Sequence, residues 1–350
     1  MGKLFSELNE AFFQSIEDMN IKIDKPEQID KVLEKVLPEI SDIIFKQLSM
    51  NAGEMLQEQS YIRDEFEARL HGRWMRAFNL LEMLIVMNTE VGQEFIEQTS
   101  TEENKSYKFN VLFRIHTRAC QITYEILTLL KSGFPDGAIA RWRTLHELAV
   151  LSFFIFDNDE ELALRYIEYE GIENAKEMFE YQKRCGKLGY KPLLWKEIDR
   201  IKQRRRELIM KYGQEFAEEY GWTCSVLEKS KRNFKGIEEQ VSLQHLRPFY
   251  KMACDQIHLG PKGNVISLAL MGDNDRTNFY LCGASNYGLA DPGQNAAISL
   301  VQIATCLLTF TPTIDKLVIL KCMETTCKKL CQEFVDIQHQ IEDEEECSEK

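Results

Sequence analysis

The residues of this chain best suited to chemistry lie in the segment GFPDGAIARWRTLHELAV, residues 133–150. Arg143, His146 and Glu147 are three and four positions apart, so on a helix they share one face. An arginine can stabilise the charge of a phosphate, a histidine can exchange a proton near neutral pH, and Glu147 would orient one of the two. In the structural alternative, Arg143 and Glu147 form an ion pair that only fixes the helix.

His258 is the second candidate, because it ends a predicted helix over 242–258, just before a Gly-Pro turn. The negative end of the helix dipole favours a charged imidazolium there, which suits His258 to giving or taking a proton. The pattern therefore predicts a cleft between this helix and the helix of Arg143. The alternative is that His258 only caps carbonyl groups of its own helix.

The sequence has no pattern typical of a metal or cofactor site. Asp255 and His258 are three positions apart, but no His-x-x-x-His, Glu-x-x-His or Cys-x-x-Cys completes a ligand set. The glycine-rich phosphate loops and the serine-hydrolase motif are also missing. We therefore expect no metal and no cofactor. The ten cysteines, in a chain without a signal peptide, are typical of reduced thiols in a cytoplasmic protein.

Charge limits the partners of the chain. Its 350 residues include 43 Lys and Arg against 56 Asp and Glu, a net charge of −13. Such a protein is no general nucleic-acid coat, so any polyanion must bind at a local basic site. The basic block Lys202–Arg206 offers Arg204 and Arg205 as phosphate contacts. The alternative is a solvated surface, because acidic residues share the same helix.

The elements that must position these residues are helices. Glycine and proline are sparse, at 18 and 8 residues, and apolar residues recur at spacings of three and four. We predict an all-α multi-helix bundle with at most one small β-hairpin, over 265–271 and 277–282. The expected helices cover about residues 4–19, 29–48 (kinked or divided at Pro38), 55–96, 109–130, 138–156, 160–183, 193–212, 242–258, 292–314 and 313–339.

The polar stretch Glu97–Tyr107 is the expected linker between an N-terminal helical region, 1–100, and a main bundle domain, 107–340. Residues 341–350 are expected to form an acidic disordered tail. The uncharged stretch 292–314 is long enough to cross a membrane, but its polar residues and Pro312 predict a core helix instead. We therefore expect no membrane partner.

The stretch GFPDGAIARWRTLHE resembles a bacterial family of helical proteins known only as a domain of unknown function. The resemblance covers about residues 107–335. It implies a helical fold but no activity, because none is established for that family. The matching residues are the turn Gly137-Ala138, then Arg143-Thr144-Leu145 and Glu147, and more loosely Tyr250 and His258 of a distant helix.

The same region is also similar, more weakly, to the HEPN helical domains. Many of these are metal-independent ribonucleases of bacterial toxin and anti-phage systems. Their motif is an arginine, four to six residues, then a histidine, and Arg141 and His146 fit it with four residues between. Trp142 departs from the pattern, because a polar residue usually follows the arginine. This resemblance implies that Arg141 and His146 act in RNA cleavage.

Two functions are therefore predicted. The first is a metal-independent phosphodiesterase or ribonuclease of HEPN-like type, acting on RNA or another phosphate-bearing ligand. Arg143, Glu147, His258, Arg141 and His146 would be its catalytic residues, and Tyr250, Arg204 and Arg205 its substrate contacts. The alternative is a non-enzymatic interaction or scaffold module, whose N-terminal helices pack on a protein partner or a second copy of the chain.

Overall fold

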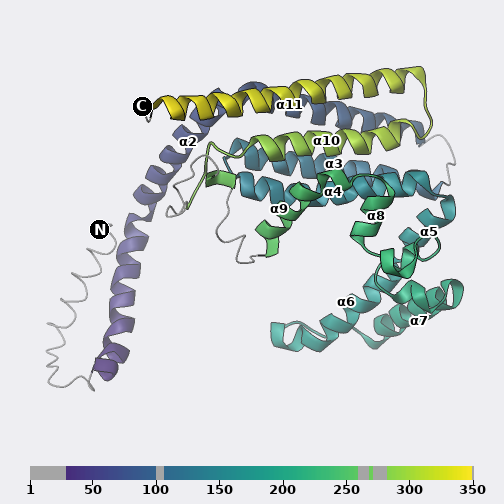
Figure 1. The fold of residues 1–350 in the computed structure, drawn as a ribbon. Coiled ribbons are helices and arrows are strands. Elements are labelled where there is room, and N and C mark those ends of the chain that lie inside the picture. The colour runs from purple at the N-terminus through teal and green to yellow at the C-terminus, as the bar shows by residue number, and fades with distance from the viewer. Residues whose placement is uncertain (1–28, 100–105, 259–267, 271–281, 349–350) are drawn as a thin grey trace. The chain divides into compact units, whose positions relative to one another are not determined.

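A computed structural model of the chain describes residues 29–99, 106–258, 268–270 and 282–348. The chain divides into two compact units, Met1–Arg69 and Leu70–Lys350. All regular structure in the described ranges is helical (Figure 1), which confirms the prediction of an all-α protein. The expected helix over 4–19 lies outside the described residues.

Helix α2, Ile29–Thr99, is one continuous helix, where the sequence predicted two. Pro38 lies inside it. The gap expected between the two predicted helices, over residues 49–54, contains Gly53. A single glycine inside a helix costs only about 1 kcal/mol relative to alanine, which is not enough to end a helix of this length. Residues 29–69 of α2 belong to the first unit, and residues 70–99 belong to the second.

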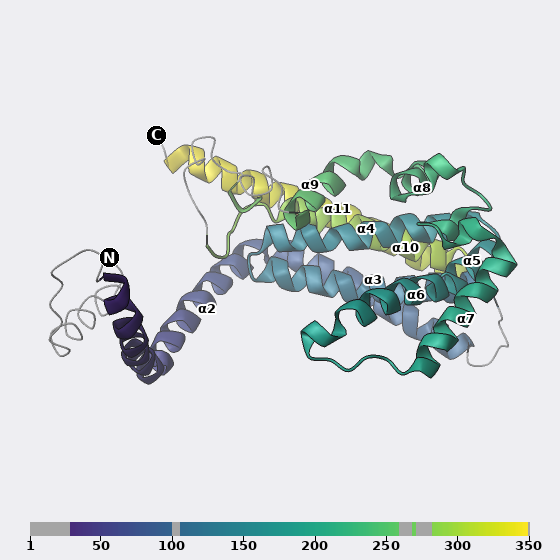
Figure 2. The ribbon, with the colours of Figure 1, turned by 90° about the horizontal axis from the view of Figure 1, so that it is seen from below.

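The second unit is a bundle built on α3 (Tyr107–Lys131), α4 (Pro135–Asp157), α10 (Ala290–Leu308) and α11 (Ile314–Ser348). Helix α10 packs against the other three (Figures 1 and 2). Residues 70–99 of α2 complete the core, because the rings of Trp74 and Phe78 lie 5.6 and 6.4 Å from the ring of Phe334 on α11.

The prediction that the uncharged stretch forms a core helix is confirmed, because most residues of α10 are buried. Its backbone approaches α11 so closely that a Cβ at Gly293 would lie 2.3 Å from the ring of Phe334. Trp142 ties α4 to α10 by donating to the carbonyl of Asn295 at 2.9 Å and to Ser299 Oγ at 3.0 Å. Among the described helices, none combines the length and the apolar character needed to cross a bilayer.

Smaller helices follow α4. They are α5 (Glu160–Glu168), α6 (Glu170–Arg184), the 3-10 helix η2 (Cys185–Leu188), α7 (Trp195–Tyr212), four further 3-10 turns, α8 (Phe234–Gln240) and α9 (Arg247–His258). Helices α6 and α7 pack together as a hairpin beside the bundle (Figures 1 and 2). The predicted helix over 242–258 therefore begins only at Arg247, and the one predicted over 160–183 is divided at Tyr169.

Two further expectations differ from the structure. Of the expected disordered tail, residues 341–348 are helical, since α11 continues to Ser348, and Arg73 Nη2 lies 2.5 Å from Glu344 Oε2. In the predicted β-hairpin, Leu268–Leu270 form a 3-10 turn instead of a strand. Residues 265–267, 271 and 277–281 of that hairpin lie outside the described residues.

Candidate functional site

Helix α4 brings its predicted site face against α9. The helix begins at Pro135 after a turn in which Gly133 has a φ of 78°, a conformation that favours glycine. Arg143 Nη2 lies 2.9 Å from Glu147 Oε1, as the spacing of four predicts. Tyr250 of α9 donates its hydroxyl to the same oxygen at 2.6 Å and accepts from Arg143 Nη2 at 3.2 Å. Arg143, Glu147 and Tyr250 therefore form one hydrogen-bonded set.

A second set lies directly behind the first. His146 Nε2 is 2.9 Å from Glu238 Oε1 of α8, and Arg247 Nη1 donates to Glu238 Oε2 at 2.6 Å. The side chains of His146 and Glu238 are 0% exposed, whereas Arg247 is 26% exposed. A carboxylate removed from water needs a paired cation, and Arg247 supplies it.

Aromatic rings join the two sets. Phe234 and Tyr250 stack with ring centroids 4.8 Å apart. The guanidinium carbons of Arg143 and Arg247 each lie 5.3 Å from the centroid of the Tyr250 ring. The two guanidinium groups therefore lie within about twice that distance of each other. We call Arg143, His146, Glu147, Phe234, Glu238, Arg247 and Tyr250 the α4–α8–α9 cluster.

Burial and neighbouring charges keep His146 and Tyr250 of the cluster uncharged at neutral pH. Burial lowers the pKa of His146, although Glu238 opposes the shift, so the imidazole is neutral at pH 7. With Nε2 facing the carboxylate, its hydrogen sits on Nε2, and the buried Nδ1 has no hydrogen-bond partner. Burial and the neighbouring Glu147 raise the pKa of Tyr250, which therefore stays protonated.

Arg141 and His146 are not brought together. Five positions on a helix place two side chains about 140° apart. Arg141 pairs with Glu125 of α3, and His146 is fully buried beside the rings of Phe234 and Tyr250. The HEPN-like prediction requires a histidine that reaches RNA, and the geometry of this chain does not present His146 to a ligand.

His258 also lies away from the cluster. It is the last residue of α9, it is exposed, and it makes no hydrogen bond or ion pair among the described residues. It follows Tyr250 by eight positions, which places the two Cα atoms about 12 Å apart along the helix. The residue of α9 that meets Arg143 is thus Tyr250, and the expected pairing of Arg143 with His258 is not observed.

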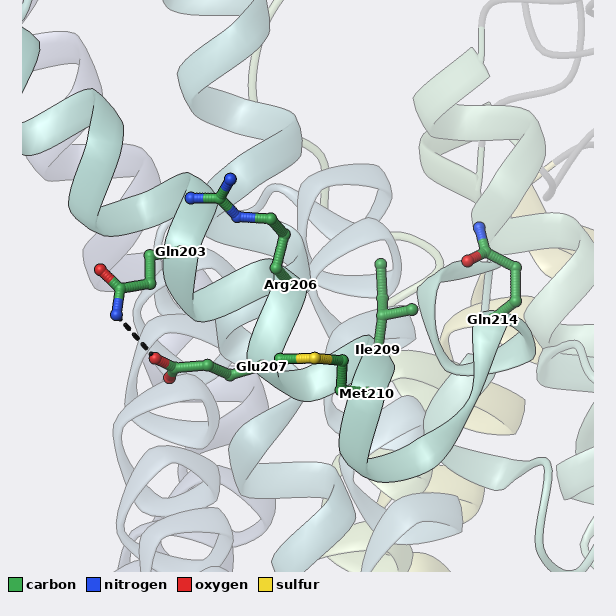
Figure 3. A pocket seen from close by; sticks show the side chains of 6 residues that line it. All are labelled: Gln203, Arg206, Glu207, Ile209, Met210 and Gln214. Carbon is green, nitrogen blue, oxygen red and sulfur yellow. Dashed lines mark hydrogen bonds between the residues drawn. The ribbon is translucent and has the colours of Figure 1, made fainter.

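Arg204 and Arg205 lie on α7, on a different part of the second unit. Arg204 pairs with Glu168 at 3.1 Å, while Arg205 makes no ion pair with any residue that the structure describes. An open hollow of about 630 Å³ lies on the same helix, but neither arginine lines it (Figure 3). Its lining residues are Gln203, Arg206, Glu207, Ile209, Met210 and Gln214.

Phe234, Glu238 and Arg247 are members of the cluster that the sequence did not indicate. Phe234 and Glu238 lie in the seven-residue helix α8, which is too short to show a helical period, and Arg247 is the first residue of α9. Their partners on α4 are about a hundred positions away, so no local spacing connects them. No three His, Cys, Asp or Glu side chains among the described residues lie close enough together to hold a metal ion.

Comparison with known proteins gives one match, and it contains every residue of the cluster. Residues 109–276 match the model of a family described as "Family of unknown function (DUF5677)". The predicted resemblance to a helical domain of unknown function is therefore confirmed over this part of the chain. The match extends from α3 past α9, whereas the sequence predicted a longer resemblance, over 107–335. No curated protein and no solved structure matches the chain. The comparisons do not support a similarity to HEPN domains.

Proposed function

We propose that the α4–α8–α9 cluster binds a phosphate-bearing ligand. The observation that carries this proposal is the position of Arg143 and Arg247 beside one tyrosine ring, each with a side chain 26% exposed. A guanidinium group matches two phosphate oxygens with two parallel N–H donors. Two such groups beside one tyrosine ring suit a ligand with one or more phosphates.

Arg143 has a donor to spare. Its Nη2 faces Glu147 and Tyr250, but its Nε is buried and has no hydrogen-bond partner among the described residues. A buried N–H group without a partner costs about 1–3 kcal/mol. A phosphate oxygen would remove that cost once the guanidinium turns Nε towards it. Glu147 is 33% exposed, so its carboxylate can turn towards water when an anion takes its place on the guanidinium.

RNA is the phosphate-bearing ligand predicted from the sequence, and its cleavage stays a prediction. General acid–base catalysis needs a group that reaches the substrate and titrates near the working pH. His146 is sealed and Tyr250 stays protonated, while His258 lies two helical turns away from Tyr250. The cluster therefore supports binding of a phosphate better than hydrolysis of a phosphodiester.

The test is the fluorescence anisotropy of a labelled single-stranded RNA with the full chain. Arg143→Gln should weaken binding by about tenfold, since a charge-assisted hydrogen bond is worth about 1.5–3 kcal/mol. Arg141→Gln is the matched control, because it removes the same charge from the same helix while its residue pairs with Glu125. Glu147→Gln should tighten binding, because it removes a carboxylate that competes with the phosphate.

Equal affinities of the Arg141→Gln and Arg143→Gln proteins would refute the proposal, as would RNA binding that Glu147→Gln weakens. Melting curves of each variant separate lost affinity from lost folding. The alternative of an interaction module predicts that Arg143→Gln lowers stability and that no RNA binds. Gel analysis of RNA incubated without metal tests the predicted cleavage in the same samples, and His258→Ala should leave both binding and RNA length unchanged.

A further inference from the structure

The second part of the hairpin, from the end of α6 through α7, has the opposite charge to the rest of the chain. Residues 183–212 carry 11 Lys and Arg and 3 Asp and Glu, a net charge of +8, which leaves −21 for the rest of the chain. Four of these cations are held in ion pairs, such as that of Lys211 with Glu168. Within the described part of the chain, the others make no ion pair; they are Lys183, Lys187, Lys191, Lys196, Arg200, Lys202 and Arg205.

The end of the hairpin, residues 185–196, which we call the hairpin tip, exposes large apolar side chains between these lysines. Leu188, Tyr190, Leu194 and Trp195 are 64, 63, 69 and 71% exposed. Single exposed apolar residues are ordinary on a protein surface, but four within eight positions, interleaved with uncompensated cations, are typical of an interaction site.

The exposure of the tip comes from an ordered loop conformation. Gly189 has a φ of 75°, which the turn after η2 requires. Tyr181 donates its hydroxyl to the carbonyl of Lys191 at 2.9 Å, and Gln182 Oε1 accepts from the backbone N–H of Leu193 at 3.1 Å. These bonds hold the loop against α6 and leave its apolar side chains pointing away from the protein core.

We infer that the hairpin tip docks on the surface of an anionic phospholipid bilayer. Leucine, tryptophan and tyrosine side chains enter the headgroup boundary, where aromatic rings with a polar edge are favoured. Lysines beside them are attracted to anionic lipids. The expectation of no membrane partner rests on the lack of a spanning helix, and contact with a bilayer surface needs none.

The composition of the tip favours lipid over nucleic acid. Bases stack on aromatic rings, so an RNA site would explain the exposure of Tyr190 and Trp195. It would not explain two exposed leucines, which offer no ring for a base to stack on. The charge distribution also orients the protein. An anionic surface repels the acidic remainder of the chain and attracts the basic hairpin, so the tip is the part that meets the bilayer.

Trp195 reports directly on this contact. It is exposed, whereas Trp74, Trp142 and Trp222 are buried at 0, 0 and 5% exposure. Vesicles of phosphatidylcholine mixed with phosphatidylglycerol should shift the tryptophan emission of the full chain to shorter wavelength and sediment with it. Vesicles of phosphatidylcholine alone should bind at least about tenfold more weakly. Trp195→Phe should remove the emission shift but keep co-sedimentation.

The leucines provide the decisive variants. Leu188→Ser with Leu194→Ser should lower the partition coefficient by at least about tenfold at unchanged charge. Leu317→Ser with Val318→Ser on α11 is the matched control, because these two side chains are also exposed, at 48 and 56%, and it should bind as the wild type does. Melting curves check that both proteins fold, since all four positions are exposed.

Three results would overturn the inference. They are an equal partition coefficient for the two double variants, equal binding to neutral and anionic vesicles, and quenching of Trp195 by RNA in a protein that ignores vesicles. The last result would assign the hairpin to nucleic acid. Arg143→Gln should leave vesicle binding unchanged, so failure here and failure of the phosphate site are distinguishable.

Discussion

Arg247→Met is expected to destabilise the second unit by about 3 kcal/mol at neutral pH. Arg247 is the one cation paired with Glu238, whose side chain is 0% exposed and whose other partner, His146, is neutral. Removing one partner of a buried ion pair costs about 3–5 kcal/mol. The lower end applies here, because Arg247 is itself partly exposed and its loss admits some water.

The same variant should reverse the local dependence of stability on pH. Without Arg247, the His146–Glu238 pair takes up one proton on folding, because a lone carboxylate is costly in that environment. A proton gained on folding makes the free energy of unfolding rise as pH falls, by up to about 1.4 kcal/mol per pH unit above about pH 6.5, because below that pH the histidine of the unfolded chain binds the same proton. In the wild type, the lowered pKa of His146 has the opposite effect, since the unfolded chain then binds more protons as pH falls.

Chemical denaturation followed by tryptophan fluorescence, between about pH 8.5 and pH 5, measures both effects: that of the variant above about pH 6.5 and that of the wild type below it. Trp142 is a suitable reporter, because its ring lies 5.2 Å from that of His146. Adding Glu238→Gln should recover most of the lost stability, since the amide is neutral and still accepts a hydrogen bond. A cost below about 1 kcal/mol, or a difference from wild type that does not change with pH, would refute this account of the buried pair.

Two further predictions concern the bundle. Burial lowers the pKa of His116 to about 4, so stability from this residue is complete above about pH 6.5 and is lost as pH falls towards 4, by about 3 kcal/mol in all. His116→Gln, measured by urea unfolding across this range, should flatten that loss. Gly293→Ala should cost about 1–3 kcal/mol in the same assay, because its Cβ would meet the ring of Phe334, whereas Gly53→Ala meets no atom within 4 Å and should not destabilise α2.

Long helices could be predicted from the sequence because their period repeats. The expected bounds of α3, α4 and α7 lie within three residues of the observed ones, whereas α10 ends at Leu308, six residues before the expected end. Between residues 213 and 246 the chain forms only 3-10 turns and the seven-residue α8, which are too short for a period to appear. The helical end of α11 was missed for another reason: Glu344 pairs with Arg73, a partner 271 positions away.

The site could be predicted on one helix but not across helices. The spacing of four between Arg143 and Glu147 follows from the geometry of any helix, and the structure shows this pair. Which residue of α9 would face it depends on how far the two helices slide along each other. His258 and Tyr250 differ by about two turns, and no local rule chooses between them. Glu238 and Arg247 depend on the same tertiary packing.

Because the chain is acidic, its basic residues without an ion-pair partner are informative. Some basic residues of the bundle pair with carboxylates, as Lys131 does with Glu82 and Arg141 with Glu125, while others, such as Arg114 and Lys328, make no ion pair among the described residues. The chain has 56 acidic residues for 43 basic ones, so a basic residue without a carboxylate partner does not result from a lack of carboxylates. The unpaired lysines of the hairpin can therefore meet an external anion without displacing a carboxylate, whereas an anion at Arg143 must displace Glu147.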